Sequence, residues 1–208
     1  MADYELLKAT DVRLNNISRE LGTDEISSDF LQDVTTSMQT VALNERDKDN
    51  PGRRTLVGLA APQIGAFVRV ILFDQNASAG EPNFDPDIRF MINPQIEKSS
   101  QQESLGREGC YSSGEICGAV HRANSAIVCG LDLNGKTACY DLKDFQARIV
   151  QHEIDHLNGI RFPDRVRKPE HLHRVGEDEF QAYREHWQTW KKQYPFEGWL
   201  IMKNGSAK

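Results

Sequence analysis

The chain has 208 residues, a formal net charge of -6 and 38% hydrophobic residues, which suggests one domain with an appendage and enough material for a core. The acidic balance argues against DNA or RNA as the main ligand, because nucleic-acid-binding proteins usually present a basic face. No run approaches 18 apolar residues and the charged N-terminus resembles no signal peptide, so the sequence predicts a protein that does not enter a membrane.

The first half of the chain predicts one helix and two strands. Apolar residues recur at helical spacing after the N-cap candidate Asp29, which predicts a helix over about 29–45. The charged run over 44–55 is typical of a surface loop. Residues 67–73 and 90–94 are rich in β-branched and aromatic side chains, so we expect a strand at each place.

A β-hairpin is predicted before the second helix. Asn134-Gly135 separates two β-rich runs, 126–133 and 136–140, and this dipeptide is the strongest short hairpin signal. The polar stretch 95–108 alternates weakly and suggests an edge strand. Asp141 or Asp144 is the candidate N-cap of the helix that follows, and this helix is expected to end near Gly159.

That second helix carries the motif on which the functional argument depends. His152 and His156 stand four residues apart, so one helix face presents both imidazoles to a single divalent cation. Glu153 is rotated away from His152, and it is placed to act as a general base on a metal-bound water. A chance match on a surface helix is the alternative reading of this short pattern.

A glycine-rich and alanine-rich strip, residues 56–65, contains a single polar side chain, Gln63. Small residues permit the close approach of another backbone, and a lone amide among apolar neighbours usually has a fixed hydrogen-bonding task. The sequence leaves open whether Gln63 serves a site or is satisfied inside a buried turn.

A catalytic metal site of the zinc type needs a third protein ligand, and Cys110 is the best candidate because it lies between a glycine and a strand-like run. The spacing of the four cysteines includes no Cys-x-x-Cys pair. We therefore expect reduced thiols in a cytoplasmic protein, with three of the cysteines as small core residues. These three are Cys117, Cys129 and Cys139.

Three stretches in this order resemble the signature motifs of the peptide deformylase family. They are Leu-Val-Gly-Leu-Ala-Ala-Pro-Gln at 56–63, Glu-Gly-Cys-Tyr-Ser at 108–112, and Gln-His-Glu-Ile-Asp-His-Leu-Asn-Gly at 151–159. The likeness extends over about residues 6–166. It implies an α+β fold in which antiparallel strands pack around a central metal-binding helix, and a catalytic domain of 1–166 with a C-terminal extension of 167–208.

The resemblance also implies an activity, the metal-dependent hydrolysis that removes the formyl group from the N-terminal methionine of newly made proteins. Its substrates would be N-formylmethionyl nascent peptides. One divalent ion would be expected, with Fe(II) as the native metal and zinc, nickel or cobalt as substitutes.

The implied roles can be assigned residue by residue. Cys110, His152 and His156 would bind the metal, and Glu153 would transfer the proton. Gln63 and the backbone N–H of Tyr111 would stabilise the oxyanion. The residues expected to line the substrate site are Val57, Gly58, Tyr111 and Arg148.

This chain departs from the family pattern at several positions near the expected substrate pocket. Leu56 replaces a glycine, Tyr111 replaces a leucine, and Arg148 stands where an aliphatic side chain commonly lines the methionine pocket. Gly114 and Cys117 stand where many bacterial members have proline and a substrate-binding arginine. These differences predict altered substrate preference and leave the metal chemistry intact.

Two other functions remain open at this stage. A thermolysin-like peptidase would use a downstream glutamate as its third ligand, and Glu177 or Glu179 is available. A divergent homologue could also bind a peptide or metal with little turnover.

The extension contains aromatic residues at near-helical spacing, which predicts a helix that packs its aromatic face on the body. A partner surface near the ribosomal exit is the functional alternative. Residues 196–202 suggest a last strand. The aromatic residues are Phe180, Tyr183, Trp187, Trp190 and Tyr194.

Overall fold

The computed structural model describes residues 4–44, 56–79 and 86–205. The loop predicted over 44–55 lies almost wholly outside the described residues. Among them, the α-helices are α1 (Asp29–Asn44), α2 (Asp144–Leu157), α3 (Phe180–His186) and α4 (Phe196–Lys203). The strands are β1 (Gly58–Ala60), β2 (Val70–Asp74), β3 (Ile88–Ser99), β4 (Glu103–Gly109), β5 (Ile116–Ala123), β6 (Ser125–Leu131), β7 (Thr137–Lys143) and β8 (Leu172–Arg174).

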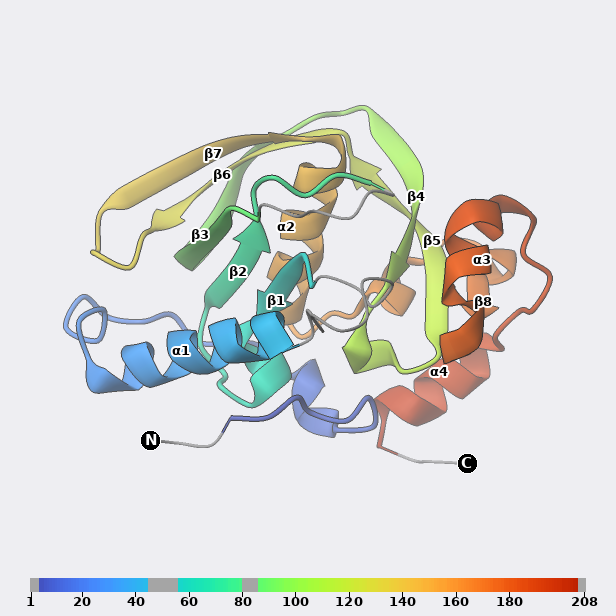
Figure 1. Cartoon of the computed structure of the whole chain (residues 1–208), viewed down its shortest axis with the longest axis horizontal. Helices are drawn as coiled ribbons and strands as arrows, with labels where there is room; N and C mark the ends of the chain where they lie inside the picture. Colours follow the sequence, from blue (N-terminus) through green and yellow to red (C-terminus); the bar gives the residue numbers. More distant parts are fainter. Residues whose placement is uncertain (1–3, 45–55, 80–85, 206–208) are drawn as a thin grey trace.

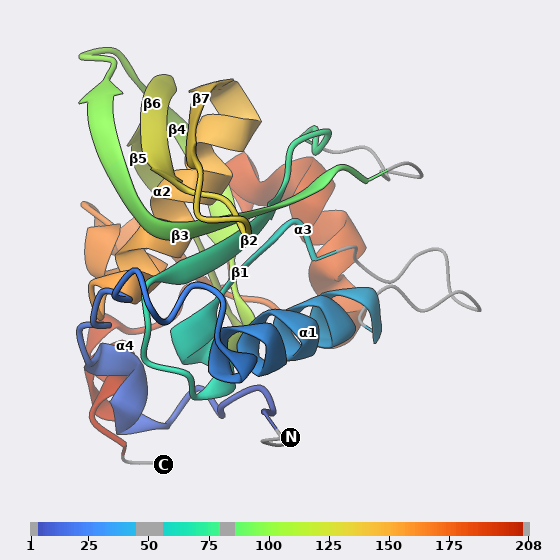
Figure 2. The ribbon, with the colours of Figure 1, turned by 90° about the vertical axis from the view of Figure 1, so that its left-hand side faces the viewer.

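The strands form two antiparallel sheets with α2 between them (Figure 1). The larger sheet has the order β1-β2-β3-β6-β7, and the smaller has the order β4-β5-β8. This arrangement confirms the predicted α+β fold with antiparallel strands around a central helix. β3 is long and curved and crosses the molecule above β2 (Figure 2).

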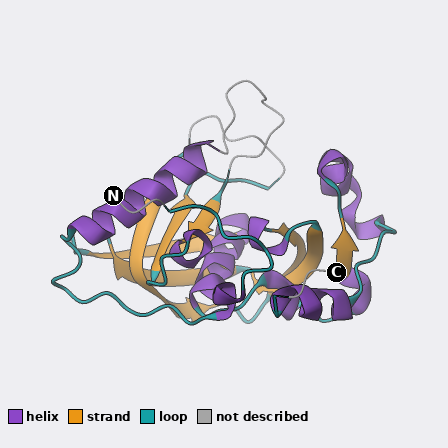
Figure 3. Cartoon of the chain, turned by 90° about the horizontal axis from the view of Figure 1, so that it is seen from below, coloured by secondary structure: helices purple, strands orange, loops and turns teal. Residues whose placement is uncertain are grey.

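Strand β2 explains how the two faces of the larger sheet are filled. All five of its residues are buried, and successive side chains point to opposite faces. Val70 and Leu72 join the core that includes α1, whereas Ile71 and Phe73 join the core that includes α2. The helices α1 and α2 therefore cover opposite faces of this sheet, as Figure 3 shows for α1.

A residue with positive φ begins helix α2, and another lies just beyond its end. Its first residue, Asp144, has a positive φ of 47°, and the preceding Lys143 is the N-cap, so the expected side-chain cap is absent there. The chain leaves the helix through Gly159, with a φ of 69°. A side chain at Gly159 would collide with the backbone of Asn15, so this turn requires glycine.

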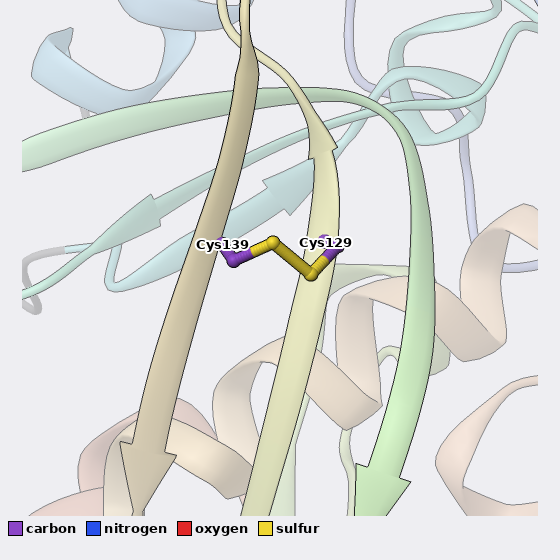
Figure 4. The surroundings of a disulfide bond; sticks show 2 residues. All are labelled: Cys129 and Cys139. Carbon is purple, nitrogen blue, oxygen red and sulfur yellow. A yellow bond between two sulfur atoms is a disulfide. The ribbon is translucent and has the colours of Figure 1, made fainter.

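The cysteine prediction is wrong for one pair. Cys129 on β6 and Cys139 on β7 face each other and form a disulfide (Figure 4). Directly opposed residues of an antiparallel pair come close enough for this bond. Cys117 is buried in the core as expected.

The extension differs from its prediction in two respects. Residues 196–203 form the helix α4 and not a strand. The aromatic run does not form one helix: its first two members lie on the short helix α3, Trp187 begins a 3-10 turn over Trp187–Thr189, and Trp190 and Tyr194 follow that turn. The buried Tyr183 packs with Phe180, Trp187 and Trp190, which agrees with the expected packing role. Strand β8 also pairs with β5, so the extension contributes a strand to the smaller sheet.

Candidate metal centre

Three potential metal ligands converge beside α2. One donor atom each from Cys110, His152 and His156 lies within 4.8 Å of the others. The two imidazole Nε2 atoms are 3.2 Å apart, and His156 Nε2 is 3.4 Å from the Cys110 Sγ. The histidines come from successive turns of α2, while Cys110 directly follows β4 and begins the 3-10 turn Tyr111–Ser113.

This donor set fits a divalent cation. Ligand bonds of about 2.0–2.3 Å in a tetrahedral arrangement place donor atoms roughly 3.3–3.6 Å apart. Burial lowers the pKa of His156 well below its usual value. Burial acts in the same direction on His152, but hydrogen bonds to Cys110 and Glu108 outweigh it and raise that pKa. One cysteine sulfur and two imidazole nitrogens at these separations are a donor set suited to a divalent ion.

Glu108 orients the first histidine. Its Oε2 is 2.8 Å from His152 Nδ1, so this nitrogen donates to the carboxylate and leaves Nε2 with its lone pair directed to the centre. Arg122 donates to both oxygens of Glu108 at 3.0 Å. Burial would raise the pKa of Glu108, but Arg122 and His152 outweigh it and hold the pKa well below its usual range.

Gln63 approaches the site from the 3-10 turn that follows β1. Its Oε1 accepts a hydrogen bond from the Ala60 N–H at 2.8 Å, which fixes the direction of the amide. Its Nε2 then donates to Cys110 Sγ at 3.2 Å and to Ser112 Oγ at 3.1 Å. The amide thus faces the centre while it is held from within the turn.

Glu153 lies buried between α2 and β1. Burial raises the pKa of this carboxyl to about 7, the range in which a group can both accept and deliver a proton near neutral pH. Its Oε2 is buried and has no hydrogen-bond partner among the described residues. A methyl group at Gly58 would collide with the Glu153 carboxylate and with Ile149, so β1 needs glycine here. Val57 packs beside the core of α2.

Arg148 does not have the position that the sequence suggested. It was expected to line the substrate site, but its side chain is buried against β4 and β5. There its guanidinium pairs with Glu108 and with backbone carbonyls. Tyr111, by contrast, is 48% exposed and lies directly beside Cys110.

The alternative third ligands lie elsewhere. Glu177 and Glu179 belong to a 3-10 turn of the extension, and Glu179 pairs with Lys192 and accepts a hydrogen bond from the Gly176 N–H. Among the described residues, the cluster that could bind a metal contains Cys110 and neither of these glutamates.

Sequence reasoning missed the residues that support the ligands. Glu108 was quoted only as part of a motif, although a ligating histidine commonly donates to a carboxylate. Arg122 lies inside a strand-like run and gives no signal of its own. Gln151 was also unassigned; its amide exchanges hydrogen bonds with the Ala123 backbone and ties α2 to β5.

Comparison with known proteins agrees with this geometry. The family model described as polypeptide deformylase matches residues 4–171. A peptide deformylase from Desulforudis audaxviator is 34% identical over 166 residues, covering 80% of this chain and 95% of that protein. Coverage differs among relatives: a chloroplastic peptide deformylase 1A from Solanum lycopersicum is 32% identical, and the match spans 78% of this chain but 59% of that one.

A solved structure leads to the same family. The Met-Ala-Ser-bound class I type b peptide deformylase from Acinetobacter baumannii superposes with a TM-score of 0.69 at 32% identity, covering 79% of this chain and 99% of that chain. The chain therefore belongs to the polypeptide deformylase family, the metal-dependent hydrolases that remove the N-formyl group from new polypeptides.

Proposed function

We propose that this chain removes the formyl group from N-formylmethionyl peptides at the site formed by Cys110, His152, His156, Glu153 and Gln63. The observation that carries the proposal is the convergence of the three metal-ligand candidates beside a buried carboxyl and an oriented amide. The products would be formate and a free N-terminal amine.

Cys110, His152 and His156 would hold one divalent ion. When bound, such an ion supplies a water whose pKa is lowered from 15.7 towards about 7. We propose Fe(II) as the native ion, with zinc, nickel or cobalt as possible replacements. The ligands alone do not select iron, because the usual affinity order favours zinc over ferrous iron.

Glu153 is the proposed proton carrier. Its raised pKa suits a group that takes a proton during attack on the formyl carbon and later delivers it to the leaving amine. The lack of a described partner for its Oε2 leaves that oxygen available for this exchange.

Gln63 and the backbone N–H of Tyr111 are the proposed donors to the oxyanion of the tetrahedral intermediate. The Gln63 amide is oriented before substrate arrives, because its Oε1 accepts from the Ala60 N–H. One donor of this kind is typically worth about 3–4 kcal/mol of transition-state stabilisation.

The edge of β1 is the proposed binding place for the substrate backbone. β1 is the terminal strand of the larger sheet, and an extended peptide can add to such an edge through main-chain hydrogen bonds. Gly58 begins this strand and lies against Glu153, and Val57 directly precedes it. The neighbour from Acinetobacter baumannii, solved with Met-Ala-Ser bound, supports a peptide of this class as ligand.

The cytoplasm is the proposed compartment, since formylated nascent chains are the substrate. None of the helices in the described part of the chain has the length and apolar character of a membrane span. Packing of Tyr183 against Trp190, with ring centroids 5.3 Å apart, favours a structural role for the aromatics of the extension over a ribosomal contact.

Formate release from formyl-Met-Ala-Ser by the Fe(II)-loaded protein tests the proposal. We expect turnover that requires the metal and stops when a chelator removes it. A protein that binds one ion per chain at Cys110, His152 and His156 and yet releases no formate would contradict the proposed activity and favour the peptide-binding or metal-binding alternative.

A further inference from the structure

Arg148 lies on α2 one helical turn before His152, and its guanidinium reaches both β4 and β5. Its Nη1 donates to Glu108 Oε1 at 2.8 Å and to the Val120 carbonyl at 2.9 Å. Its Nη2 donates to the Ser104 carbonyl at 2.8 Å. Because a buried guanidinium is costly unless its donors are paired, these contacts hold it in one place.

The Glu108 carboxylate is saturated by its neighbours. Oε1 accepts from Arg122 Nε and from Arg148 Nη1, while Oε2 accepts from Arg122 Nη2 and from His152 Nδ1. A carboxylate offers about four acceptor positions, and here each is used by a charged group or an imidazole. Rotation of this carboxylate would break several hydrogen bonds at once, so its position is fixed.

Gly106 on β4 provides the space that Arg148 occupies. A Cβ at this glycine would lie 2.7 Å from Arg148 Nη2 and 2.8 Å from its Cζ. Gly106 is not among the glycines with a positive φ, so its requirement is one of space and not of backbone conformation. Gly106 and Arg148 therefore form a matched pair on facing elements.

We propose that Arg148 is a positioning residue for the metal centre. It fixes the Glu108 carboxylate, which in turn fixes the ring orientation and the tautomer of the ligand His152. The inference rests on the proposed metal site and adds a residue to it. The partners that hold a ligating histidine typically change metal affinity by about 10–100-fold when they are removed. Arg148 acts through Glu108, so we expect its removal to weaken metal binding by a factor near the lower end of this range.

A purely structural role must be distinguished, because Arg148 also ties α2 to the carbonyls of β4 and β5. Co(II) is titrated into the metal-free protein, and the dissociation constant and the visible spectrum are measured. Thermal unfolding of the metal-free protein is measured in parallel. The variants are Arg148→Met, Arg148→Lys, Gly106→Ala and the double variant Gly106→Ala with Arg148→Met. Arg69→Met is the matched control, since Arg69 is also partly buried but hydrogen-bonds to Asn158 and Pro94 and not to Glu108.

We expect Arg148→Met to weaken Co(II) binding about tenfold and to change the absorption bands that report coordination geometry. Arg148→Lys should recover part of the affinity, because it keeps a charge beside Glu108 but loses the guanidinium fork. Gly106→Ala should reproduce the spectral change with Arg148 still present, since the new methyl group displaces the guanidinium. The double variant should be no worse than Arg148→Met alone, because the two changes disturb one contact.

The inference would be overturned if Arg148→Met and Gly106→Ala both bound Co(II) within twofold of the wild-type affinity and kept the wild-type spectrum. This holds whatever their unfolding temperatures are. If Arg148→Met does not fold, the Co(II) affinity and spectrum of Gly106→Ala and Arg148→Lys test the inference in its place. Failure of the wild-type protein to bind Co(II) at Cys110 would instead contradict the proposed metal site, so the two failures are distinguishable.

Discussion

The guanidinium of Arg161 lies over the indole ring of Trp199, with its Cζ 4.5 Å from the ring centroid. Both side chains are fully buried. Arg161 Nη1 also donates to the carbonyl of Ser112, whose hydroxyl accepts from Gln63. The extension is therefore connected to the wall of the candidate site through two residues.

Trp199→Ala should lower the free energy of unfolding by about 3–5 kcal/mol, the range for truncating a buried aromatic residue. The indole also donates to Asp164 at 2.9 Å, and this hydrogen bond would be lost. Chemical denaturation measures the effect. Phe196→Ala on the same helix is the control, since Phe196 is 40% exposed and should change stability by less than half as much. Equal effects would show that α4 contributes no buried anchor.

Cys110→Ala should abolish tight binding of the metal and, with it, formate release. Two imidazoles remain in that variant, but a three-ligand site loses its anionic donor. Metal content after dialysis is the measurement. Cys117→Ala serves as the control, because Cys117 is buried with Val175 and Tyr183 and is absent from the donor cluster. A metal-replete and active Cys110→Ala protein would rule out the ligand assignment.

Glu153→Gln should retain the metal and lose activity by at least the 10²–10⁴-fold typical of general acid–base groups. Glutamine has nearly the same size as glutamate and fits against Gly58, but it cannot carry the proton. Steady-state kcat/KM, together with metal content, distinguishes this loss from a failure to bind the ion. Turnover close to that of the wild-type protein would assign the proton transfer to another group.

His173 should make the stability of the extension dependent on pH. Its Nε2 donates to the Glu170 carbonyl at 2.9 Å, so Nδ1 accepts from the Tyr183 hydroxyl at 3.0 Å, and burial lowers the pKa of this imidazole below its usual value of 6.5. The folded protein then binds fewer protons than the unfolded chain just below pH 6.5. This contribution to the free energy of unfolding should be complete above that pH and decline as the pH falls.

Denaturation at several pH values between 7.5 and about 5 tests this dependence. We expect His173→Gln to be less stable at neutral pH but to lose less stability on acidification than the wild type. His186→Gln, at an exposed position of α3, is the matched control and should keep the wild-type slope. Identical slopes in all three proteins would assign the acid sensitivity to other groups.

The sequence predicted where helices and strands lie more reliably than it predicted which residues contact one another. The apolar period located α1 to within one residue, and Asn134-Gly135 located the β6–β7 hairpin. No Cys-x-x-Cys pair indicated the disulfide, which depends on the register of the hairpin. Asp132 and Lys136 close a loop of three residues, and this register places Cys129 opposite Cys139. A shift of one residue in the register would have put the two side chains on opposite faces.

The errors at the site and in the extension have a similar cause. The spacing of His152 and His156 is a property of one helix, so their convergence could be predicted from sequence. The direction of Arg148 depends on a missing side chain at Gly106, on a strand 42 residues away. Helix α4 was predicted as a strand because its composition is apolar, and the packing of Trp199 with Ile116 and Leu172 is a tertiary contact that composition does not reveal.

Tyr111 is expected to set part of the preference for the first substrate side chain. It follows Cys110 directly and is about half-exposed, and it replaces the leucine of the family motif. We expect wild-type protein to prefer a narrower or more polar side chain than methionine by about 1–3 kcal/mol in transition-state binding, the range that one methylene can supply. Tyr111→Leu should restore the preference for methionine without loss of metal.

The measurement is kcat/KM over a panel of formyl-X-Ala-Ser peptides that differ only in the first residue. Tyr111→Phe is the control that separates the two properties of the side chain, because it keeps the ring and removes the hydroxyl. If the ring excludes methionine, Tyr111→Phe should rank the peptides as the wild type does; if the hydroxyl recruits polar groups, it should rank them as Tyr111→Leu does. The same ranking in all three proteins would show that Tyr111 has no part in specificity.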